Sequence, residues 1–246
     1  MLSNNTPFED VLNAYKALLV FLEMHQFKTF QLKLIPKIYH LQASDEMDYL
    51  LFKIQARNIR KDISSVIINS NKLSIESSNR KRGIKKAIKN NLNIKEVNDF
   101  KLFWDDILIP NLQASHQTKP VHSLEEITYL KSKFPNNINQ YVVYNEGTIV
   151  AGITIFETET VAHIQYISAS LEGKKLGSLD FLINYMINEK YAQKTYFDFG
   201  ISNENQGANI NKGLLNWKES FGARSVIHDF YEIKISNHYL LNDLYL

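Results

Sequence analysis

The chain has 246 residues, of which 44% are hydrophobic and 22% charged, with a formal net charge of +2. This composition is typical of a soluble globular protein, and the small net charge excludes bulk electrostatic attraction to nucleic acid. Because the sequence contains no cysteine, it excludes disulfides, zinc–thiolate sites, iron–sulfur clusters and a thiol nucleophile.

The first 77 residues predict the order helix, strand, helix, strand. The N-terminus has no secretory signal, and no run reaches the ~20 apolar residues of a membrane helix, so we expect a cytoplasmic protein without a membrane span. Thr6 is a predicted N-cap with Pro7 at the first helical position. The predicted elements are a helix over 7–26, a strand over 29–35, a helix over 44–54 and a strand over 62–69.

The second part of the chain predicts a longer alternation of helices and strands. Ser123 and Glu126 form a capping box, and the turn at 145–147 predicts a hairpin. In chain order, the predicted helices cover 78–90, 99–112, a segment from Ser123, 174–191 and 207–221. The predicted strands cover 92–97, 140–144, 148–157, 161–169, 195–199 and 223–235. Helices that cross over between strands predict an α/β fold with a mixed sheet.

Two motifs in this second part carry a family resemblance. YFDFG at 196–200 follows a predicted helix, and WKESFGAR at 217–224 ends the next one. With PNLQASHQTKPVHSLEEI at 110–127 and the order of elements, they resemble the FemAB-like (FemABX, peptidyltransferase-related) branch of the GNAT-fold acyltransferases, as found in bacterial surface-glycan clusters. The resemblance covers residues 78–235.

The resemblance implies a domain organisation of tandem units. FemAB-like proteins carry two GNAT units, and helix-strand-helix-strand is the back half of one unit. We therefore interpret residues 1–77 as a truncated N-terminal unit, 78–91 as a basic connecting helix and 92–246 as a complete acyltransferase domain. The first unit is expected to support the second and to form one wall of an acceptor cleft. The edge strand that the truncation exposes favours a homodimer.

The resemblance also places an acyl donor, acetyl-CoA or another acyl-CoA, where the fourth and fifth strands of the complete unit separate. Lys174 replaces the basic residue of the family's pyrophosphate loop, and Leu179 stands where the loop has a small residue. A modified pyrophosphate loop and a plain helix cap with two solvated lysines both stay open. Aminoacyl-tRNA, the donor of FemAB proteins, is the alternative. The predicted cofactor-binding residues are Ile167, Ser168, Lys174, Lys175, Gly177, Ser178 and Asn211.

Four residues are candidates for catalysis. His163 or His122 could take the proton of an ammonium acceptor, although a lone histidine in a strand is more often packed and hydrogen-bonded. Tyr166 or Gln165 could orient the acceptor or donate to the developing oxyanion. By resemblance, Lys218 faces the cleft and stabilises carbonyl charge or holds a carboxylate. Strand alternation predicts His163, Gln165 and Ile167 on one face, and Ala162, Ile164, Tyr166 and Ser168 on the other.

A second group of residues is predicted to bind the acceptor. Asp198 lies in a buried motif, where an isolated carboxylate is costly, so it should bind backbone N–H groups of its loop, Lys218 or a substrate amine. Trp217 aligns with the tyrosine general acid of ordinary GNAT enzymes and cannot supply a proton to a leaving thiolate. The predicted substrate-binding residues are Tyr39, Lys119, Gln165, Asp198, Ser202, Asn203 and Trp217.

The run from 80 to 89 contains six positive charges in ten residues. It could contact the phosphates of a nucleotide-sugar, an undecaprenyl-linked glycan or a tRNA acceptor stem. It could equally be a solvated connecting helix, and the lack of interleaved aromatic residues favours this for RNA, so no nucleic acid other than tRNA is expected. His116 and His122 have no spaced carboxylate partner, so we expect no metal site.

Together these features predict an N-acyltransferase. It would move an acyl or aminoacyl group from a CoA-type or tRNA donor to an amine of a small-molecule sugar-nucleotide, glycan or cell-wall precursor. Direct attack is expected, because no Ser/His/Asp order suggests a covalent enzyme intermediate. The alternative is a catalytically retired GNAT-like binding module, which would explain the truncated unit, the altered loop and the missing tyrosine.

Overall fold

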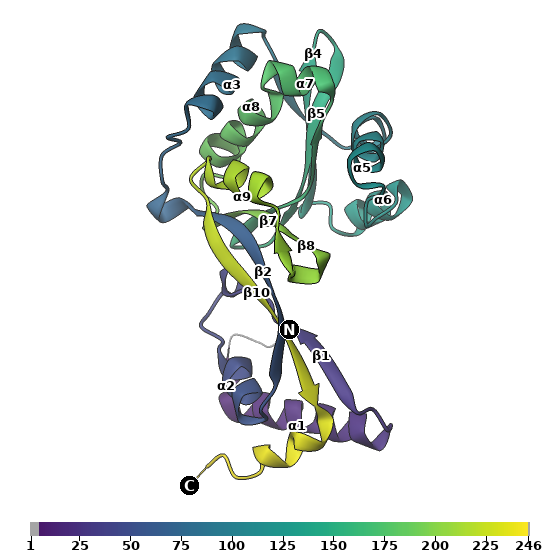
Figure 1. The fold of residues 1–246 in the computed structure, drawn as a ribbon, viewed down its shortest axis with the longest axis vertical. Coiled ribbons are helices and arrows are strands. Elements are labelled where there is room, and N and C mark those ends of the chain that lie inside the picture. The colour runs from purple at the N-terminus through teal and green to yellow at the C-terminus, as the bar shows by residue number, and fades with distance from the viewer. Residues whose placement is uncertain (1–4, 246) are drawn as a thin grey trace. The chain divides into compact units, whose positions relative to one another are not determined.

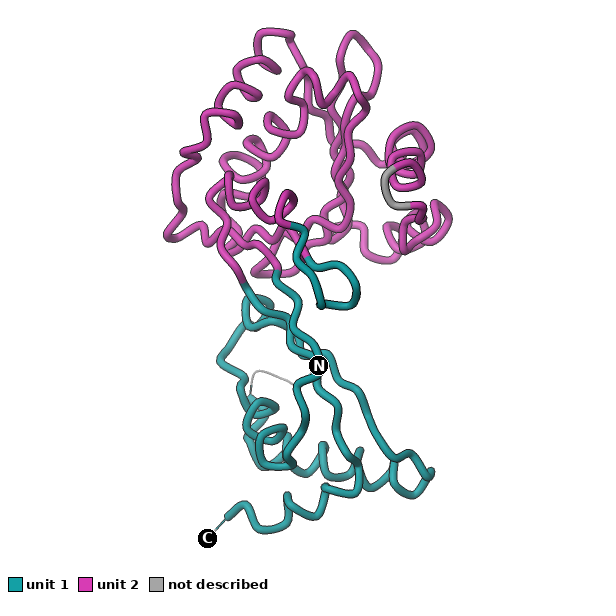
Figure 2. Tube along the Cα trace, in the orientation of Figure 1, with its two compact units in different colours: residues 1–63, 203–211, 226–246 teal, residues 64–202, 212–225 magenta. Residues whose placement is uncertain are grey.

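The computed structural model describes residues 5–245, apart from the side chains of residues 115 and 116. The chain forms two compact units (Figure 2): unit 1 comprises residues 1–63, 203–211 and 226–246, and unit 2 comprises residues 64–202 and 212–225. These units differ from the expected segments 1–77, 78–91 and 92–246, because the last strand and the C-terminal residues pack with the N-terminal part. The interpretation of residues 1–77 as a truncated repeat stays a prediction.

Unit 1 packs helices against a small antiparallel sheet. Its core joins Leu12 and Leu19 of the first helix to Leu50 of the second and to Ile233 near the C-terminus. Strand β1 pairs antiparallel with β10 and is an end strand of the sheet. Its elements are α1 (Phe8–Met24), β1 (Thr29–Lys33), η1 (Lys37–Tyr39), α2 (Glu46–Lys53), the first part of β2 (Arg57–Ile68), most of β10 (Arg224–Lys234), η6 (Ile235–Leu241) and a small hairpin within residues 203–211.

Unit 2 contains a mixed sheet in the order β2-β7-β6-β5-β4-β3. The strands from β3 to β6 are antiparallel neighbours, whereas β6 and β7 run parallel. The predicted mixed α/β fold is therefore confirmed (Figure 1). The strands that follow β2 are β3 (Asn93–Val97), β4 (Ile138–Asn145), β5 (Thr148–Glu157), β6 (Val161–Ala169) and β7 (Tyr196–Ile201).

Helices cover both faces of this sheet (Figure 1). On one face, a core that includes Leu182 and Phe221 packs against the sheet, with residues from α3 (Ser78–Lys89), α7 (Leu171–Leu176), α8 (Ser178–Tyr185), η4 (Met186–Lys190) and α9 (Lys212–Glu219). The short η2 (Asn69–Asn71), between β2 and α3, has no buried residue. The other face buries Trp104 and Ile127 beneath α4 (Lys101–Phe103), η3 (Trp104–Leu108), α5 (Ile109–His116) and α6 (Leu124–Lys133). The predicted capping box of Ser123 and Glu126 begins α6.

Two helices differ from their predicted ranges. The helix predicted over 174–191 begins at Leu171 and is interrupted at Gly177, whose φ of +76° ends the first turn. The helix predicted over 207–221 begins only at Lys212, because a small hairpin of β8 (Asn203–Glu204), η5 (Asn205–Gly207) and β9 (Asn209–Ile210) precedes it. Asn205 has positive φ in that turn, a conformation that asparagine tolerates well.

Candidate active site

The candidate site lies where two parallel strands separate. Strands β6 and β7 pair only from Val161 to His163 on one side and from Tyr196 to Asp198 on the other. Beyond these pairs β6 continues beside β5 alone, while β7 turns into the loop that leads to α9. Such a separation leaves backbone groups and side chains of both strands available to a ligand.

A histidine and a carboxylate meet at this point. His163 Nδ1 lies 3.0 Å from Asp198 Oδ2, and Oδ1 of the same carboxylate accepts the N–H of Gly200 at 2.8 Å and the hydroxyl of Ser64. The Asp198 side chain is fully buried, whereas 23% of the His163 side chain is exposed. The carboxylate is therefore held inside the protein, and the imidazole extends from it toward the surface.

This geometry sets the proton positions on His163. A carboxylate can only accept hydrogen bonds, so Nδ1 of His163 donates to Asp198. In the neutral ring Nε2 is then unprotonated and can accept a proton from a substrate. A buried carboxylate that fixes the tautomer and orientation of a histidine is the arrangement that makes histidine an efficient general base.

Lys218 pins the loop that follows Asp198. Its Nζ donates to the carbonyl oxygens of Gly200 and Ile201, both at 2.7 Å. Burial lowers the pKa of Lys218 to about 8, and the charge of Asp198 partly offsets this effect. The structure thus places Lys218 on two loop carbonyls in the interior, which differs from the predicted position facing the cleft.

Two irregularities in the strands shape the site. The register between β5 and β6 shifts so that Gln165 forms a bulge, and the register between β2 and β7 shifts beside Gly200, which has a φ of +75°. The predicted alternation is therefore wrong beyond Gln165. Tyr166 joins the face of His163, and Ile167 packs with the opposite core.

His122 and Tyr166 form a second pair on the face of His163. The Tyr166 hydroxyl accepts the backbone N–H of His122 at 3.0 Å and lies 2.7 Å from its Nδ1. Burial raises the pKa of Tyr166, so its hydroxyl keeps its proton at neutral pH. The ring of Phe156, which pairs across the strands with His163, lies 6.0 Å from the ring of His122. Phe156 therefore lies beside His122 and is the cross-strand neighbour of His163.

No protein-family model and no curated protein sequence matches the chain, but solved structures do. FemX matches 96% of this chain and 79% of its own with a TM-score of 0.68 and 9% identity. L-PGS from Bacillus licheniformis matches 94% and 76%, with a TM-score of 0.63 and 13% identity. A third match is the C-terminal domain of a protein from Agrobacterium fabrum named as a lysylphosphatidylglycerol synthetase, with a TM-score of 0.61, 12% identity and coverage of 91% and 73%.

The chain has a FemAB-like GNAT fold. The fold implied by the resemblance of YFDFG and WKESFGAR is thereby confirmed. At identities this low the likeness shows the fold alone, so the activity has to be argued from the residues of this chain.

In this FemAB-like fold, residues of the predicted pyrophosphate loop are packed inside the protein. Ser178 is fully buried, and a Cβ on Gly177 would lie 2.4 Å from the carbonyl oxygen of Gly83 in α3. The Ser170 hydroxyl accepts the N–H of Gly173 at 3.0 Å and caps the short helix α7. Lys174 and Lys175 are exposed. The structure therefore places Gly177 and Ser178 in a helix contact, and this loop does not fit a pyrophosphate.

The remaining predicted residues are spread over both units. Trp217 packs against Phe199 and Phe221 in the core of unit 2, Ser202 is buried, and Lys119 is exposed between α5 and α6. Ser168 accepts a hydrogen bond of 2.8 Å from Asn111. Three residues belong to unit 1: Tyr39 in η1, and Asn203 and Asn211 in or beside the hairpin of β8 and β9. The side chain of His116 lies outside the described part of the chain.

Two residues at the site were not singled out from the sequence. Gly200 was visible only as the last letter of the YFDFG motif, and Ser64 lies on β2, distant in sequence from Asp198. The available signal for Ser64 was its position beside Ser65 at the start of the apolar run 66–68, where two buried hydroxyl groups need partners.

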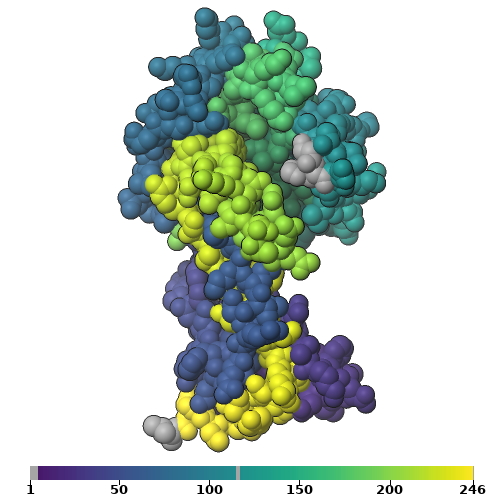
Figure 3. Space-filling model, viewed as in Figure 1, coloured from purple at the N-terminus to yellow at the C-terminus, as the bar shows by residue number. Residues whose placement is uncertain are grey.

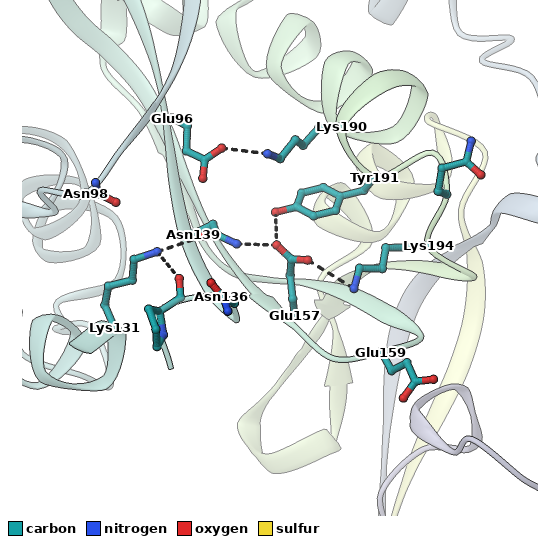
Figure 4. Close-up of a pocket in the computed structure, with 12 residues that line it drawn as sticks. Glu96, Asn98, Lys131, Asn136, Asn139, Glu157, Glu159, Lys190, Tyr191 and Lys194 are labelled. Carbon is teal, nitrogen blue, oxygen red and sulfur yellow. Dashed lines mark hydrogen bonds and ion pairs between the residues drawn. The ribbon is translucent and has the colours of Figure 1, made fainter. Parts of the chain in front are cut away.

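A polar pocket of about 710 Å³ lies elsewhere in unit 2 (Figure 4). Glu157 at its centre accepts the hydroxyl of Tyr191 at 2.7 Å, and its other oxygen lies 3.4 Å from Lys194. Lys190 and Glu96 pair at 2.9 Å. The charged groups here largely pair with one another, and the pocket shares no residue with the His163–Asp198 site. The separation of β6 and β7 is therefore the candidate site that the proposal below develops.

Across the described residues, no group of three or more histidine or acidic side chains could hold a metal ion. In the same part of the chain, no helix combines the length and apolar character required to cross a membrane.

Proposed function

We propose that the protein is an acyl- or aminoacyltransferase in which His163, positioned by Asp198, acts as the general base toward an acceptor amine. The observation that carries this proposal is the hydrogen bond between His163 Nδ1 and the buried carboxylate, at the point where β6 and β7 separate. The FemAB-like fold supports a transferase of this kind.

The proposed reaction is a direct attack on the donor carbonyl. Nε2 of His163 takes a proton from the ammonium group of the acceptor, and the resulting amine attacks the carbonyl carbon. A C–N bond forms, and the C–S bond of a thioester or the C–O bond of an aminoacyl ester breaks. The attached nitrogen then gives up its second proton to solvent, and the leaving thiolate or alkoxide takes up a proton from solvent, so that the net proton released by the reaction is the one held on His163. The acceptor class that we propose is an amine of a sugar-nucleotide, a glycan or a cell-wall precursor.

The other predicted catalytic residues have supporting roles in this scheme. The Tyr166 hydroxyl engages His122 at both its backbone N–H and Nδ1, so His122 presents Nε2 to a ligand. We assign His122 to orienting the acceptor or the carbonyl oxygen. Lys218 positions the loop that supplies the Gly200 N–H to Asp198. Neither role requires a change in the position of these side chains.

Both donor classes belong to the proposal, an acyl-CoA and an aminoacyl-tRNA. Because Gly177 and Ser178 pack against α3, we derive no step through the predicted pyrophosphate loop. An acyl-CoA would have to bind through other groups beside β6, and an aminoacyl-tRNA would need only its aminoacyl end to reach His163.

The first experiment compares ligands by thermal shift. Acetyl-CoA, free CoA, charged tRNA and UDP-sugars are added separately, and a ligand at 100 times its dissociation constant should add about 2.7 kcal/mol of stability. Stabilisation by CoA or by charged tRNA identifies the donor class, and transfer to amine acceptors is then assayed with that donor. Stabilisation without turnover for any acceptor would instead support a retired binding module.

A further inference from the structure

Helix α3 carries five exposed cations on one face: Lys81, Arg82, Lys85, Lys86 and Lys89. At 3.6 residues per turn these positions fall within about 140° of the helix circumference. The opposite face packs into unit 2 through Gly83 and Ala87, so the cations point away from the core. In Figure 3 this helix forms the upper left part of the visible surface.

The positive charge of this face is not neutralised by neighbouring groups. Helix α3 contains no acidic residue, and its sixth cation, Arg80, pairs with Asp180 on the inner side. None of the five outer cations has an ion pair among the residues that the structure describes. Helix α7, whose end contacts α3 through Gly177 and Gly83, carries two further exposed cations, Lys174 and Lys175, and one exposed acid, Glu172.

The same two helices also carry exposed aliphatic side chains. Ile88 on α3 is 57% exposed, and Leu171, the first residue of α7, is 77% exposed. A helix that combines a cationic face with outward aliphatic groups can place both at the boundary between lipid headgroups and acyl chains. We call the five outer cations of α3, with Ile88, Lys174, Lys175 and Leu171, the basic surface.

We propose that the basic surface docks the protein on an anionic phospholipid membrane. Four to eight clustered cations on an amphipathic helix are enough to bind anionic headgroups, at roughly 1 kcal/mol for each cation near the membrane. The aliphatic residues favour a membrane over RNA, because single-stranded nucleic acid is bound with aromatic stacking and none of the residues in the basic surface is aromatic. Docking would bring the enzyme to acceptors that are carried on lipid.

The test measures co-sedimentation of the full chain with vesicles. We expect binding to vesicles of 70% phosphatidylcholine and 30% phosphatidylglycerol at 50 mM NaCl, and little binding to pure phosphatidylcholine or at 500 mM NaCl. The double variant Lys85→Glu/Lys86→Glu should bind the anionic vesicles at least tenfold more weakly. The variant Ile88→Asn should weaken binding to the anionic vesicles at 50 mM NaCl by a smaller factor.

A matched control removes the same charge elsewhere. Lys28→Glu/Lys33→Glu changes two exposed lysines of unit 1 and alters the net charge equally, so its binding should stay within about twofold of the wild type. Equal loss in both double variants would show a general charge effect and overturn the proposal. Salt-sensitive binding of tRNA through Lys85 and Lys86, without vesicle binding, would also overturn it. These outcomes measure binding alone, so they are independent of the proposed transferase activity.

Discussion

Asp198 and His163 are joined by a hydrogen bond of 3.0 Å in which the carboxylate is fully buried and the imidazole is partly exposed. A second histidine–carboxylate pair, His238 with Glu23 at 2.9 Å, has an acceptor side chain that is 49% exposed. Solvent screens the second pair and lets it exchange partners, whereas Asp198 is fixed by Ser64 and Gly200. Only the first pair can hold an imidazole in one tautomer and one orientation.

The first prediction concerns His163→Gln. This change removes the proton acceptor at Nε2 but keeps a side chain that can donate to Asp198, so we expect turnover to fall by about 10²–10⁴-fold. The melting temperature should change by only a few degrees, because the side chain is partly exposed. The measurement is transfer from the donor that stabilises the wild type. His238→Gln is the matched control, and equal turnover in the two variants would rule out His163 as the base.

The second prediction concerns the loop glycine at position 200. Gly200→Ala places a Cβ 3.4 Å from His163 Cε1 in a residue with a φ of +75°. The new contact is an ordinary one, so the effect comes from the backbone: alanine in this conformation costs about 1–2 kcal/mol, and strain in the loop whose N–H holds Asp198 should lower turnover by roughly tenfold by loosening the position of His163.

Gly147→Ala is the control that separates the cost of a strained backbone from the effect of position 200 on His163. Gly147 has a φ of +84° in the hairpin turn, and a Cβ there meets no atom within 4 Å. The same loss of about 1–2 kcal/mol is expected from chemical denaturation, with unchanged turnover. If both variants lose the same turnover, the position of Gly200 against His163 has no role in activity.

The third prediction concerns the buried Lys218. Its pKa is lowered by burial from 10.5 to about 8, so between these pH values the unfolded chain binds a proton that the folded chain has lost. Stability contributed by Lys218 therefore rises with pH across this window, by about 3 kcal/mol in total. Below pH 8 both states are protonated and the cost of burying the charge is constant.

The predicted rise in stability with pH is tested with Lys218→Met. The unfolding free energy of the wild type minus that of the variant should increase by about 3 kcal/mol from pH 7 to pH 10.5, measured by urea denaturation. Lys212→Met, which removes an exposed lysine of the same helix, should give a difference that does not vary with pH. Parallel curves for the wild type and Lys218→Met would show that the lysine is not desolvated.

Much of the fold followed from local patterns, but the arrangement of the site did not. The hydrophobic periodicity and the capping box at Ser123 are local signals, and the corresponding elements are present. His163 and Asp198 were each singled out, yet their pairing joins residues that are 35 positions apart on neighbouring parallel strands. Strand order and register are decided by tertiary packing, which single-sequence periodicity does not encode.

Two predictions, the alternation of side chains along β6 and the role of Gly177, differ from the structure for physical reasons. A bulge at Gln165 reverses the predicted alternation, because one extra residue moves every following side chain to the other face. Gly177 matched a phosphate-loop glycine in the sequence, but its missing side chain serves the close approach of α3 at Gly83. A glycine that admits a ligand and one that admits a helix look the same in the sequence.

The last prediction concerns Tyr15 of α1, a core residue of unit 1 that is 5% exposed. Burial raises the pKa of Tyr15, and its hydroxyl has no hydrogen-bond partner among the described residues. Tyr15→Phe removes this unsatisfied group without leaving a large cavity, so the free energy of unfolding should increase by about 1 kcal/mol.

Tyr191→Phe is the matched comparison, with the opposite expected sign. Its hydroxyl contacts Tyr141 at 3.0 Å and donates to Glu157 at 2.7 Å, so its removal should lower the free energy of unfolding by about 1–2 kcal/mol. Urea denaturation of both variants beside the wild type measures the two effects. Destabilisation by Tyr15→Phe would mean that the hydroxyl of Tyr15 has a hydrogen-bond partner in solution, such as an ordered water molecule. The buried hydroxyl would then not lower the stability of unit 1.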